Sequence, residues 1–283
     1  MQGEISRVIL VVLDGLRADA IDTFGMTHLE SLIRAGSYTV AAETVAPSVT
    51  AAAMTSLLTG VPPSVHGVRS DRFHIPSRSG PVDPVPATLA AAGIPTFAFI
   101  RQLPRWAVPL AQRTARRLAV AECVFQGTSA AEIVVGAQQA LRAESRGLFV
   151  MHWPDADEAG HSHGWMSAAY GAAARRLDAA LGLLAGWTDV LADPGTLLIA
   201  LADHGGGGVL SNNHDSDHPH DRTIPIVVAG GRVNPGPIQG PVSLLDVPAT
   251  ILAAMGVAVP ASYTGRPLHD TIAPPVDHVV AVA

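Results

Sequence analysis

The sequence predicts an α/β fold, a sandwich in which helices cover a parallel sheet. Short runs rich in Val, Ile, Leu and Phe lack strict alternation of polar and apolar residues, which is typical of strands buried on both faces. Between these runs lie segments with apolar residues at three- and four-residue intervals, and alternating strands and helices are the pattern of α/β domains. With 48% hydrophobic residues, a chain of 283 residues can bury a substantial core.

Several apolar runs are expected to form the strands of the sheet. Each is short enough for a strand, and the runs lack the length of a helix. The first run, VILVVL, ends at Asp14, and a later one, LLIALA, ends at Asp203. The expected strands cover residues 7–13, 96–100, 147–152, 196–202 and 223–229.

Helices are expected between these strands. Residues 27–30 (THLE) have the spacing of a capping box, and Gly36 is a typical stop after the apolar run that follows. Pro47 and Ser48 are typical helix-start residues ahead of an Ala-rich run, so Thr50 is expected near a helix N-terminus. Two longer amphipathic helices are expected at 129–144 and 166–184.

A single domain is expected over residues 1–283. No internal repeat or low-complexity linker is visible in the sequence. Clusters of Pro and Gly at 62–63, 77–86 and 205–208 are typical of loops within a domain. Residues 102–127 are basic and irregular, and a small cap or loop region is expected there.

Composition and charge restrict the partners and the location. The net charge of −6 and the lack of a Lys/Arg-rich block argue against nucleic acid, whose backbone requires clustered positive charge. No apolar run approaches the roughly 20 residues of a membrane span, and the N-terminus shows no basic leader or cleavage site, so a cytoplasmic location is expected. The single cysteine, Cys123, excludes a disulfide framework and is expected to fill the core.

Acidic residues follow three of the expected strands. The runs end at Asp14, at Asp155 and Asp157, and at Asp203 with His204. An isolated Asp after a strand is usually a helix cap or a turn former. Open α/β sheets bind ligands at the C-terminal ends of their strands, so three such ends on one edge are expected to converge on one pocket.

Histidines are concentrated in the same part of the chain, because seven of the twelve lie between His152 and His220. Imidazole with carboxylate is the ligand set that Zn²⁺ prefers in catalytic sites, and it also suits Mn²⁺ or Fe. Asp157 and His161 stand four residues apart, a spacing that allows both to bind one ion. Asp203 and His204 are adjacent, so an extended segment would point them apart and a turn would bring them together.

A candidate nucleophile lies in the segment APSVTAAAMTSLLTG, residues 46–60. At a helix N-terminus, the dipole and the free N–H groups favour an alkoxide and a bound phosphoryl group. The segment alone allows a simpler interpretation, in which Ser48 or Thr50 is only an N-cap. It also gives no reason to prefer one hydroxyl over the other.

Taken together, these segments resemble the alkaline phosphatase superfamily, and within it the nucleotide pyrophosphatase/phosphodiesterase-like branch. The motifs occur in order over nearly the whole chain: VVLDGLRAD, PSVTAAAMTSLLTG with VPPSVHGV, WPDADEAGHSHG, ALADHGG, and NNHDSD with TIPIVVAGG. The closing segment SLLDVPATILAAMGVAVPASYTGRPL is similar as well. The resemblance implies an alkaline-phosphatase-like three-layer α/β/α sandwich with a mostly parallel central sheet.

The resemblance also implies the roles of individual residues. Asp14, Asp203 and His204 would hold one divalent metal ion together with the nucleophile. The second ion would be held by Asp157, His161 and His214. The nucleophile would be Thr50 and not Ser48, because the family's nucleophile stands nine residues before the Thr of the TG pair, here Thr59.

The implied reaction is the hydrolysis of a small phosphate ester through a phosphothreonine on Thr50. Two divalent ions, with Zn first and Mn or Fe as alternatives, would activate the hydroxyl and stabilise the leaving oxygen. A phosphodiesterase or nucleotide pyrophosphatase is the leading interpretation. A phosphomonoesterase or a phosphonate hydrolase is the alternative. A sulfatase is disfavoured because its nucleophile would be a modified Cys or Ser, and a non-catalytic metal-binding protein is disfavoured because every expected ligand is present.

The sequence departs from the family at the substrate contacts. Related phosphodiesterases carry an Asn five residues after the His of the HG pair, where this chain has Asp71. An ionised carboxylate there would repel phosphate. Asp71 is therefore either protonated or serves another purpose, or nearby Arg69 or Arg72 makes the phosphate contact instead. Arg101 follows an expected strand and is a further candidate for substrate binding.

Other polar residues near the motifs match no ligand position. His163, His218 and His220 are expected to be solvated or to lie behind the ligands. His152 is expected in the core or behind the ligands, and Asp155 is a candidate for orienting a ligand histidine. The sequence leaves the oligomeric state open.

Overall fold

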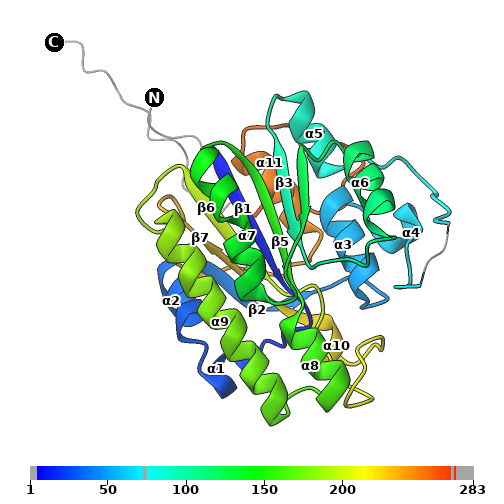
Figure 1. The fold of residues 1–283 in the computed structure, drawn as a ribbon, viewed down its shortest axis with the longest axis vertical. Helices are drawn as coiled ribbons and strands as arrows, with labels where there is room; N and C mark the ends of the chain where they lie inside the picture. Colours follow the sequence, from blue (N-terminus) through cyan, green and yellow to red (C-terminus); the bar gives the residue numbers. More distant parts are fainter. Residues whose placement is uncertain (1–4, 73–74, 269–270, 272–283) are drawn as a thin grey trace.

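The fold is a three-layer α/β/α sandwich around one mixed sheet, shown by a computed structural model that describes residues 5–72, 75–268 and 271 (Figure 1). The sheet has the strand order β4-β3-β5-β1-β6-β7-β2-β8. Neighbouring strands from β4 to β6 run parallel, whereas β7 is antiparallel to both β6 and β2. The expected α/β class with a mostly parallel sheet is therefore confirmed. The strands are β1 (Arg7–Leu13), β2 (Ser37–Glu43), β3 (Thr96–Ile100), β4 (Glu122–Phe125), β5 (Gly147–Trp153), β6 (Thr196–Leu201), β7 (Thr223–Ala229) and β8 (Gly236–Pro237).

Helices cover both faces of the sheet. On one face, α7 packs on β3 and β5, α2 packs on β7, and the long helix α9 packs on α1, α2 and α7. On the other face, α3, α5 and α11 pack on one another, and α5 also packs on β3 (Figure 1). The helices are α1 (Ala20–Phe24), α2 (Thr27–Ala35), α3 (Thr50–Thr59), α4 (Pro63–His66), α5 (Val85–Ala91), α6 (Val108–Arg117), α7 (Ala130–Ala143), α8 (Asp155–His163), α9 (Ala168–Thr188), α10 (Pro219–Arg222) and α11 (Asp246–Ala254).

The five apolar runs form strands as predicted, with ends shifted by at most one residue. Burial explains why they were recognisable, because every residue of β5 and β6 is buried. The strand β2 was not predicted, because exposed residues interrupt it and its register with β7 shifts between Thr39 and Ala42. Such a strand shows neither the alternation of polar and apolar residues nor the continuous apolar run by which strands are recognised in a sequence.

The start of α2 differs from the prediction. Thr27 is the first helical residue, the N-cap position is Met26, and no side chain at that position accepts a hydrogen bond. The free N–H groups of His28 and Leu29 instead donate to the two oxygens of Asp178, a buried residue of α9. The helix is thus capped by a carboxylate from a distant part of the chain, which satisfies the same orphan donors as a local cap.

Residues 102–127 contain α6 and β4. β4 pairs in parallel with β3 and forms the edge of the central sheet, so this part of the segment belongs to the sheet and not to a cap over it. Cys123, expected to fill the core, is half-buried in β4. Among the described helices, none is both long enough and apolar enough to cross a membrane.

The sheet places three strand ends side by side. β1 lies between β5 and β6, and all three run parallel, so their C-terminal ends lie at one edge of the sheet. Asp14 follows β1, α8 follows β5, and Asp203 with His204 follows β6. The N-terminus of α3 reaches the same edge, where Thr50 contacts Asp14 and His204.

Candidate metal centre

The first candidate ligand set consists of Asp14, Asp203 and His204, whose ligand atoms all lie within 4.8 Å of one another. The His204 Nε2 atom is 3.3 Å from Asp14 Oδ1 and 3.6 Å from Asp203 Oδ2. All three side chains are buried. The turn after β6 therefore brings the adjacent Asp203 and His204 together, which settles the alternative that the sequence left open.

The second candidate ligand set lies on α8 and on the loop before α10. Asp157 and His161 share one face of α8, and His161 Nε2 is 3.4 Å from Asp157 Oδ1. His214 Nε2 lies 3.2 Å from His161 Nε2 and 3.8 Å from Asp157 Oδ1. His204 also belongs to this group, because ligand atoms of Asp157, His204 and His214 lie within 4.8 Å of one another. The resemblance assigned His204 to the first set alone, whereas the structure places it between the two.

Backbone contacts at Gly15 join the two sets. The Asp157 N–H donates to the Asp14 carbonyl at 3.0 Å, and the Gly15 N–H donates to Asp203 Oδ1 at 3.2 Å. Gly15 has a φ of +69°, and a Cβ atom there would lie 2.9 Å from the Asp157 Cα atom. Only glycine permits this close approach, so the spacing of the two sets is fixed by the main chain.

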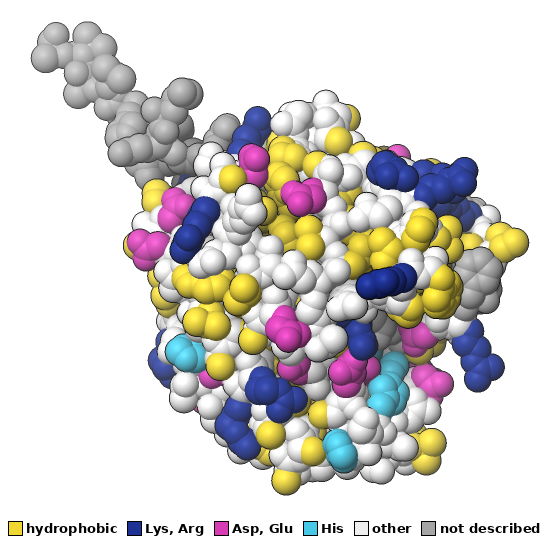
Figure 2. Space-filling model, viewed as in Figure 1, with side chains coloured by type: hydrophobic (Ala, Val, Ile, Leu, Met, Phe, Trp, Pro, Cys, Tyr) yellow, Lys and Arg dark blue, Asp and Glu magenta, His cyan; other side chains and the backbone are white. Residues whose placement is uncertain are grey.

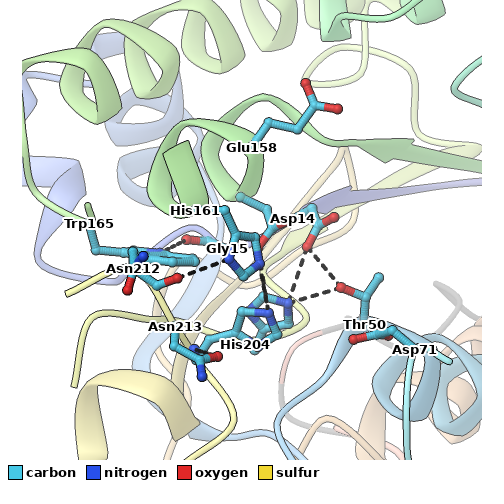
Figure 3. Close-up of polar contacts among 12 residues, drawn as sticks. Asp14, Gly15, Thr50, Asp71, Glu158, His161, Trp165, His204, Asn212 and Asn213 are labelled. Atoms are coloured by element: carbon cyan, nitrogen blue, oxygen red, sulfur yellow. Dashed lines mark hydrogen bonds and ion pairs between the residues drawn. The ribbon is translucent and has the colours of Figure 1, made fainter. Parts of the chain in front are cut away.

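Thr50 lies beside the first set. Its Oγ1 atom is 3.1 Å from His204 Nε2 and 3.4 Å from Asp14 Oδ1 (Figure 3). It is the first residue of α3, as expected, and no side chain caps this helix at the N-cap position. The Ser48 hydroxyl instead donates to the His214 carbonyl, away from the helix start. The two hydroxyls that the segment alone could not distinguish therefore have different surroundings.

Hydrogen bonds fix the tautomers of the three candidate ligand histidines. The Nδ1 atoms of His161, His204 and His214 lie 3.0, 2.8 and 2.6 Å from the carbonyl oxygens of Asn212, Gly205 and Ser48. A carbonyl oxygen only accepts, so each Nδ1 carries the hydrogen. The lone pair of each neutral imidazole is then on Nε2, the atom that faces the cluster, as in metal-binding histidines.

Two buried oxygen atoms of the cluster accept no hydrogen bond. Asp157 Oδ1 and Asp203 Oδ2 are both without a donor within the described residues. Buried carboxylate oxygens are costly unless a hydrogen bond or a cation compensates them. Together with the three oriented Nε2 atoms, they form a donor set of carboxylates and imidazoles that fits divalent transition metals.

The electrostatics of the protein residues alone favour binding of a cation. Burial raises the pKa of Asp14 well above its usual range, and the nearby Asp203 and Asp157 raise it further. Burial also raises the pKa of Asp157. Burial lowers the pKa of His204, but Asp203 and Asp14 outweigh it and raise the value to about 10. A proton therefore competes with a cation for the Nε2 lone pair of His204.

The three candidate substrate residues differ in their contacts. Asp71 accepts a hydrogen bond of 2.8 Å from the Ala51 N–H at the start of α3. Arg72 is exposed, and its backbone N–H donates to the Ser70 hydroxyl. Arg101 forms an ion pair with Glu158, whose carboxylate points away from the cluster (Figure 3). Asp71 therefore contacts the helix start next to Thr50.

Several polar residues occupy other positions. His152 is buried, with Nε2 3.3 Å from Asp14 Oδ2, so it lies behind the first set as expected. Asp155 was a candidate for orienting a ligand histidine, but it accepts from the Ala130 N–H at the start of α7 and pairs with Arg176. His218 accepts from the N–H of His220.

Sequence reasoning missed the residues that support the ligands. The Trp165 indole N–H and the Tyr170 hydroxyl both donate to the Gly15 carbonyl at 2.9 Å. The Trp165 ring lies edge-on to His161 and His214, with centroids 5.2 and 5.8 Å apart. Asn213 Oδ1 accepts from the His214 N–H at 2.7 Å. The NNH sequence was the available signal for Asn213, whereas the contacts of Trp165 depend on tertiary packing.

The fold is shared with a solved structure of a protein in the alkaline phosphatase superfamily, and the two candidate ligand sets lie at the edge of its sheet. A sequence model of the type I phosphodiesterase / nucleotide pyrophosphatase family matches residues 8–224. The chain belongs to this family, which confirms the resemblance seen in its motifs.

Solved structures support the fold. Murine ectonucleotide pyrophosphatase / phosphodiesterase 5 is 14% identical, with a TM-score of 0.71 over 90% of this chain and 96% of that chain. A Vibrio parahaemolyticus protein of the alkaline phosphatase superfamily is 19% identical, with a TM-score of 0.73 over 96% of this chain and 72% of that chain. Listeria monocytogenes lipoteichoic acid synthase LtaP is 15% identical, with a TM-score of 0.68 over 95% and 77%.

Curated relatives match a smaller part of the chain. The 2,3-bisphosphoglycerate-independent phosphoglycerate mutase of Rhodopirellula baltica is 29% identical over 147 residues. The corresponding mutase of Shewanella baltica is 29% identical over 143 residues. In both cases the match spans 50% of this chain and 26% of the mutase, so the chain covers about a quarter of the length of these relatives.

Proposed function

We propose that this protein is a two-metal phosphoric ester hydrolase, with phosphodiesters and nucleotide pyrophosphates as its leading substrates, and that Thr50 is the nucleophile. The observation that carries the proposal is the position of Thr50 Oγ1, within 3.4 Å of both Asp14 Oδ1 and His204 Nε2 at the start of a helix. The structure of murine ectonucleotide pyrophosphatase / phosphodiesterase 5 supports it, because that protein is described as inactive with a Thr-to-Ala substitution and in complex with AMP.

The two ligand sets are the proposed metal-holding residues. Asp14, Asp203 and His204 would hold one ion, and Asp157, His161 and His214 the other, with His204 near both. Zn²⁺ fits this mixture of carboxylate and imidazole best, and Mn²⁺ or Fe also fits. Such ions, when bound, lower the pKa of a nearby hydroxyl and neutralise charge on phosphoryl oxygens. This accounts for an anionic substrate on a protein of net charge −6.

Thr50 performs the displacement in two steps. In the first, a bond forms between Thr50 Oγ1 and phosphorus, the ester P–O bond breaks, the hydroxyl proton is lost, and the leaving alcohol takes up a proton. In the second, water attacks the phosphothreonine, restores the hydroxyl and releases phosphate or a phosphomonoester. The N-terminal position of Thr50 on α3 favours negative charge at both steps, because the first N–H groups of a helix are unsatisfied within it.

The substrate class is tested by initial rates with Zn²⁺ or Mn²⁺ supplied. An aryl phosphodiester, an aryl phosphomonoester, an aryl sulfate and phosphonoacetate are compared at equal concentration. We expect the diester to be hydrolysed fastest. A preference for the monoester or for phosphonoacetate by orders of magnitude would identify the alternative phosphomonoesterase or phosphonate hydrolase instead.

The nucleophile is tested by Thr50→Ala, which we expect to lower turnover by about 1,000-fold or more because no other hydroxyl replaces it. Metal content, measured by plasma mass spectrometry, should stay unchanged. Thr55→Ala is the matched control, since Thr55 lies in the same helix and its hydroxyl bonds the Ala51 carbonyl. Retention of near-full activity by Thr50→Ala would refute the assignment.

A further inference from the structure

The start of α3 carries a negative charge that the proposed reaction does not use. The Ala51 N–H directly follows Thr50, and it donates to Asp71 Oδ1 at 2.8 Å. Asp71 is exposed, and it lies beside Thr50 (Figure 3). A fixed carboxylate therefore borders the position from which Thr50 would meet a substrate.

A phosphoryl group attacked by Thr50 must come to this same helix start. Its oxygens would be favoured there by the unsatisfied N–H groups, but the N–H of Ala51, the second residue of α3, is already bound to Asp71. The group must therefore tolerate a carboxylate at close range. The cost depends on the charge of the phosphoryl group, because each added negative charge is repelled by Asp71.

We propose that Asp71 determines substrate specificity by charge, favouring phosphodiester groups over phosphomonoesters; this rests on the proposed function. A phosphodiester carries one negative charge, whereas a phosphomonoester carries nearly two above its second pKa of about 6. If the phosphoryl group lies about 4 Å from the Asp71 carboxylate, one extra negative charge on that group weakens its binding by about fivefold with the screening of bulk water. At an effective dielectric constant of about 20, the same charge weakens binding by several hundredfold. The preference then comes from a protein side chain as well as from the metals.

The test compares Asp71→Asn with the unchanged protein, both loaded with Zn²⁺. An Asn side chain keeps an oxygen that accepts from the Ala51 N–H. This variant therefore removes the charge but preserves the hydrogen bond that caps the start of α3. We expect kcat/KM for an aryl phosphomonoester, relative to that for the diester, to rise at least fivefold, with most of the change in KM. Asp22→Asn removes the same charge from an exposed position on α1 and should leave the ratio unchanged.

A second measurement distinguishes charge from structure. Raising the salt concentration from about 10 mM to about 500 mM should weaken the discrimination of the unchanged protein, because exposed charges are screened, and should have little effect on Asp71→Asn. Asp71→Ala should shift the ratio similarly but lower the melting temperature, since it also removes the cap.

The outcomes separate the two proposals. If the unchanged protein hydrolyses neither ester while loaded with metal, the proposed function fails. If it hydrolyses the diester, but Asp71→Asn leaves the ratio within twofold of the original, the inference about Asp71 is overturned and the proposed function stands.

Discussion

The two ligand sets differ in depth and in the elements that carry them. Asp14, Asp203 and His204 follow the central strands β1 and β6, and their side chains are at most 7% exposed. In the other set, the side chains of His161 and Asp157 are 44% and 16% exposed. Figure 2 shows histidine and acidic side chains together at the surface over α8. The first set is part of the core, whereas the second lies at its boundary.

This difference predicts unequal contributions to metal binding. Buried ligands that directly follow packed strands are already oriented, so a cation there gains charge compensation without ordering the protein. His214 is also buried, but the two α8 ligands, His161 and Asp157, are partly solvated, so an ion there would exchange more readily. We expect the first set to hold its ion more tightly.

The largest effect is expected from Asp203→Asn, which changes the first set. The variant keeps an oxygen for the N–H groups of Gly15 and His204, but it places an amide where the carboxylate oxygen Oδ2 has no donor among the described residues. Turnover should fall by about 1,000-fold or more. Plasma mass spectrometry should show loss of one ion per chain that excess Zn²⁺ does not restore. Full recovery with added metal would contradict the deep position of this site.

A smaller effect is expected from His161→Ala in the second set. Turnover at low metal should fall on the order of 100-fold and should recover substantially with excess Zn²⁺, because Asp157 and His214 remain. The metal content at low Zn²⁺ should drop from two ions to one. His163→Ala is the matched control, an exposed histidine at the end of the same helix. Equal losses in the two variants would show that His161 is not a ligand.

The smallest effect concerns the stability of the metal-free protein. Burial and the neighbouring carboxylates raise the pKa of Asp14 in the folded state above its unfolded value. The stability it contributes is therefore present below the unfolded pKa and is lost as pH rises through the raised folded pKa. Asp14→Asn removes this loss and should stabilise the metal-free protein at pH 8 by about 1–3 kcal/mol in urea unfolding.

The metal-loaded protein supplies the control for that measurement. With Zn²⁺ bound, Asp14→Asn should be destabilising, because the variant loses binding energy that only the folded state receives. Asp157→Asn should stabilise the metal-free protein less, since Asp157 is partly exposed. A metal-free Asp14→Asn variant that is less stable than the unchanged protein at pH 8 would contradict this account of the first set.

The sequence predicted the deep part of the site better than its surroundings. Asp14 and Asp203 were found because each follows an apolar run, and fully buried strands have a clear sequence pattern. The family spacing to Thr59 singled out Thr50, which the segment alone could not separate from Ser48. These predictions depend on local sequence or on motif order, and the structure brings the residues together.

What the sequence did not predict depends on contacts between distant residues. The cap of α2 comes from Asp178, about 150 positions away, so the THLE pattern gave the wrong N-cap. The position of His204 between both sets follows from the turn after β6, which its adjacency to Asp203 did not determine. The contact of Asp71 with Ala51 spans 20 positions and two helices, so sequence reasoning recognised the departure but not its partner.

Trp165 gives the second ligand set an optical signal of its own. The indole is buried, donates to the Gly15 carbonyl and lies edge-on to both His161 and His214. Its emission should therefore change when these imidazoles gain or lose a cation, whereas Trp106, which is largely exposed, should report only on solvent. Metal occupancy of the second ligand set can then be followed by intrinsic fluorescence, without a dye or a turnover assay.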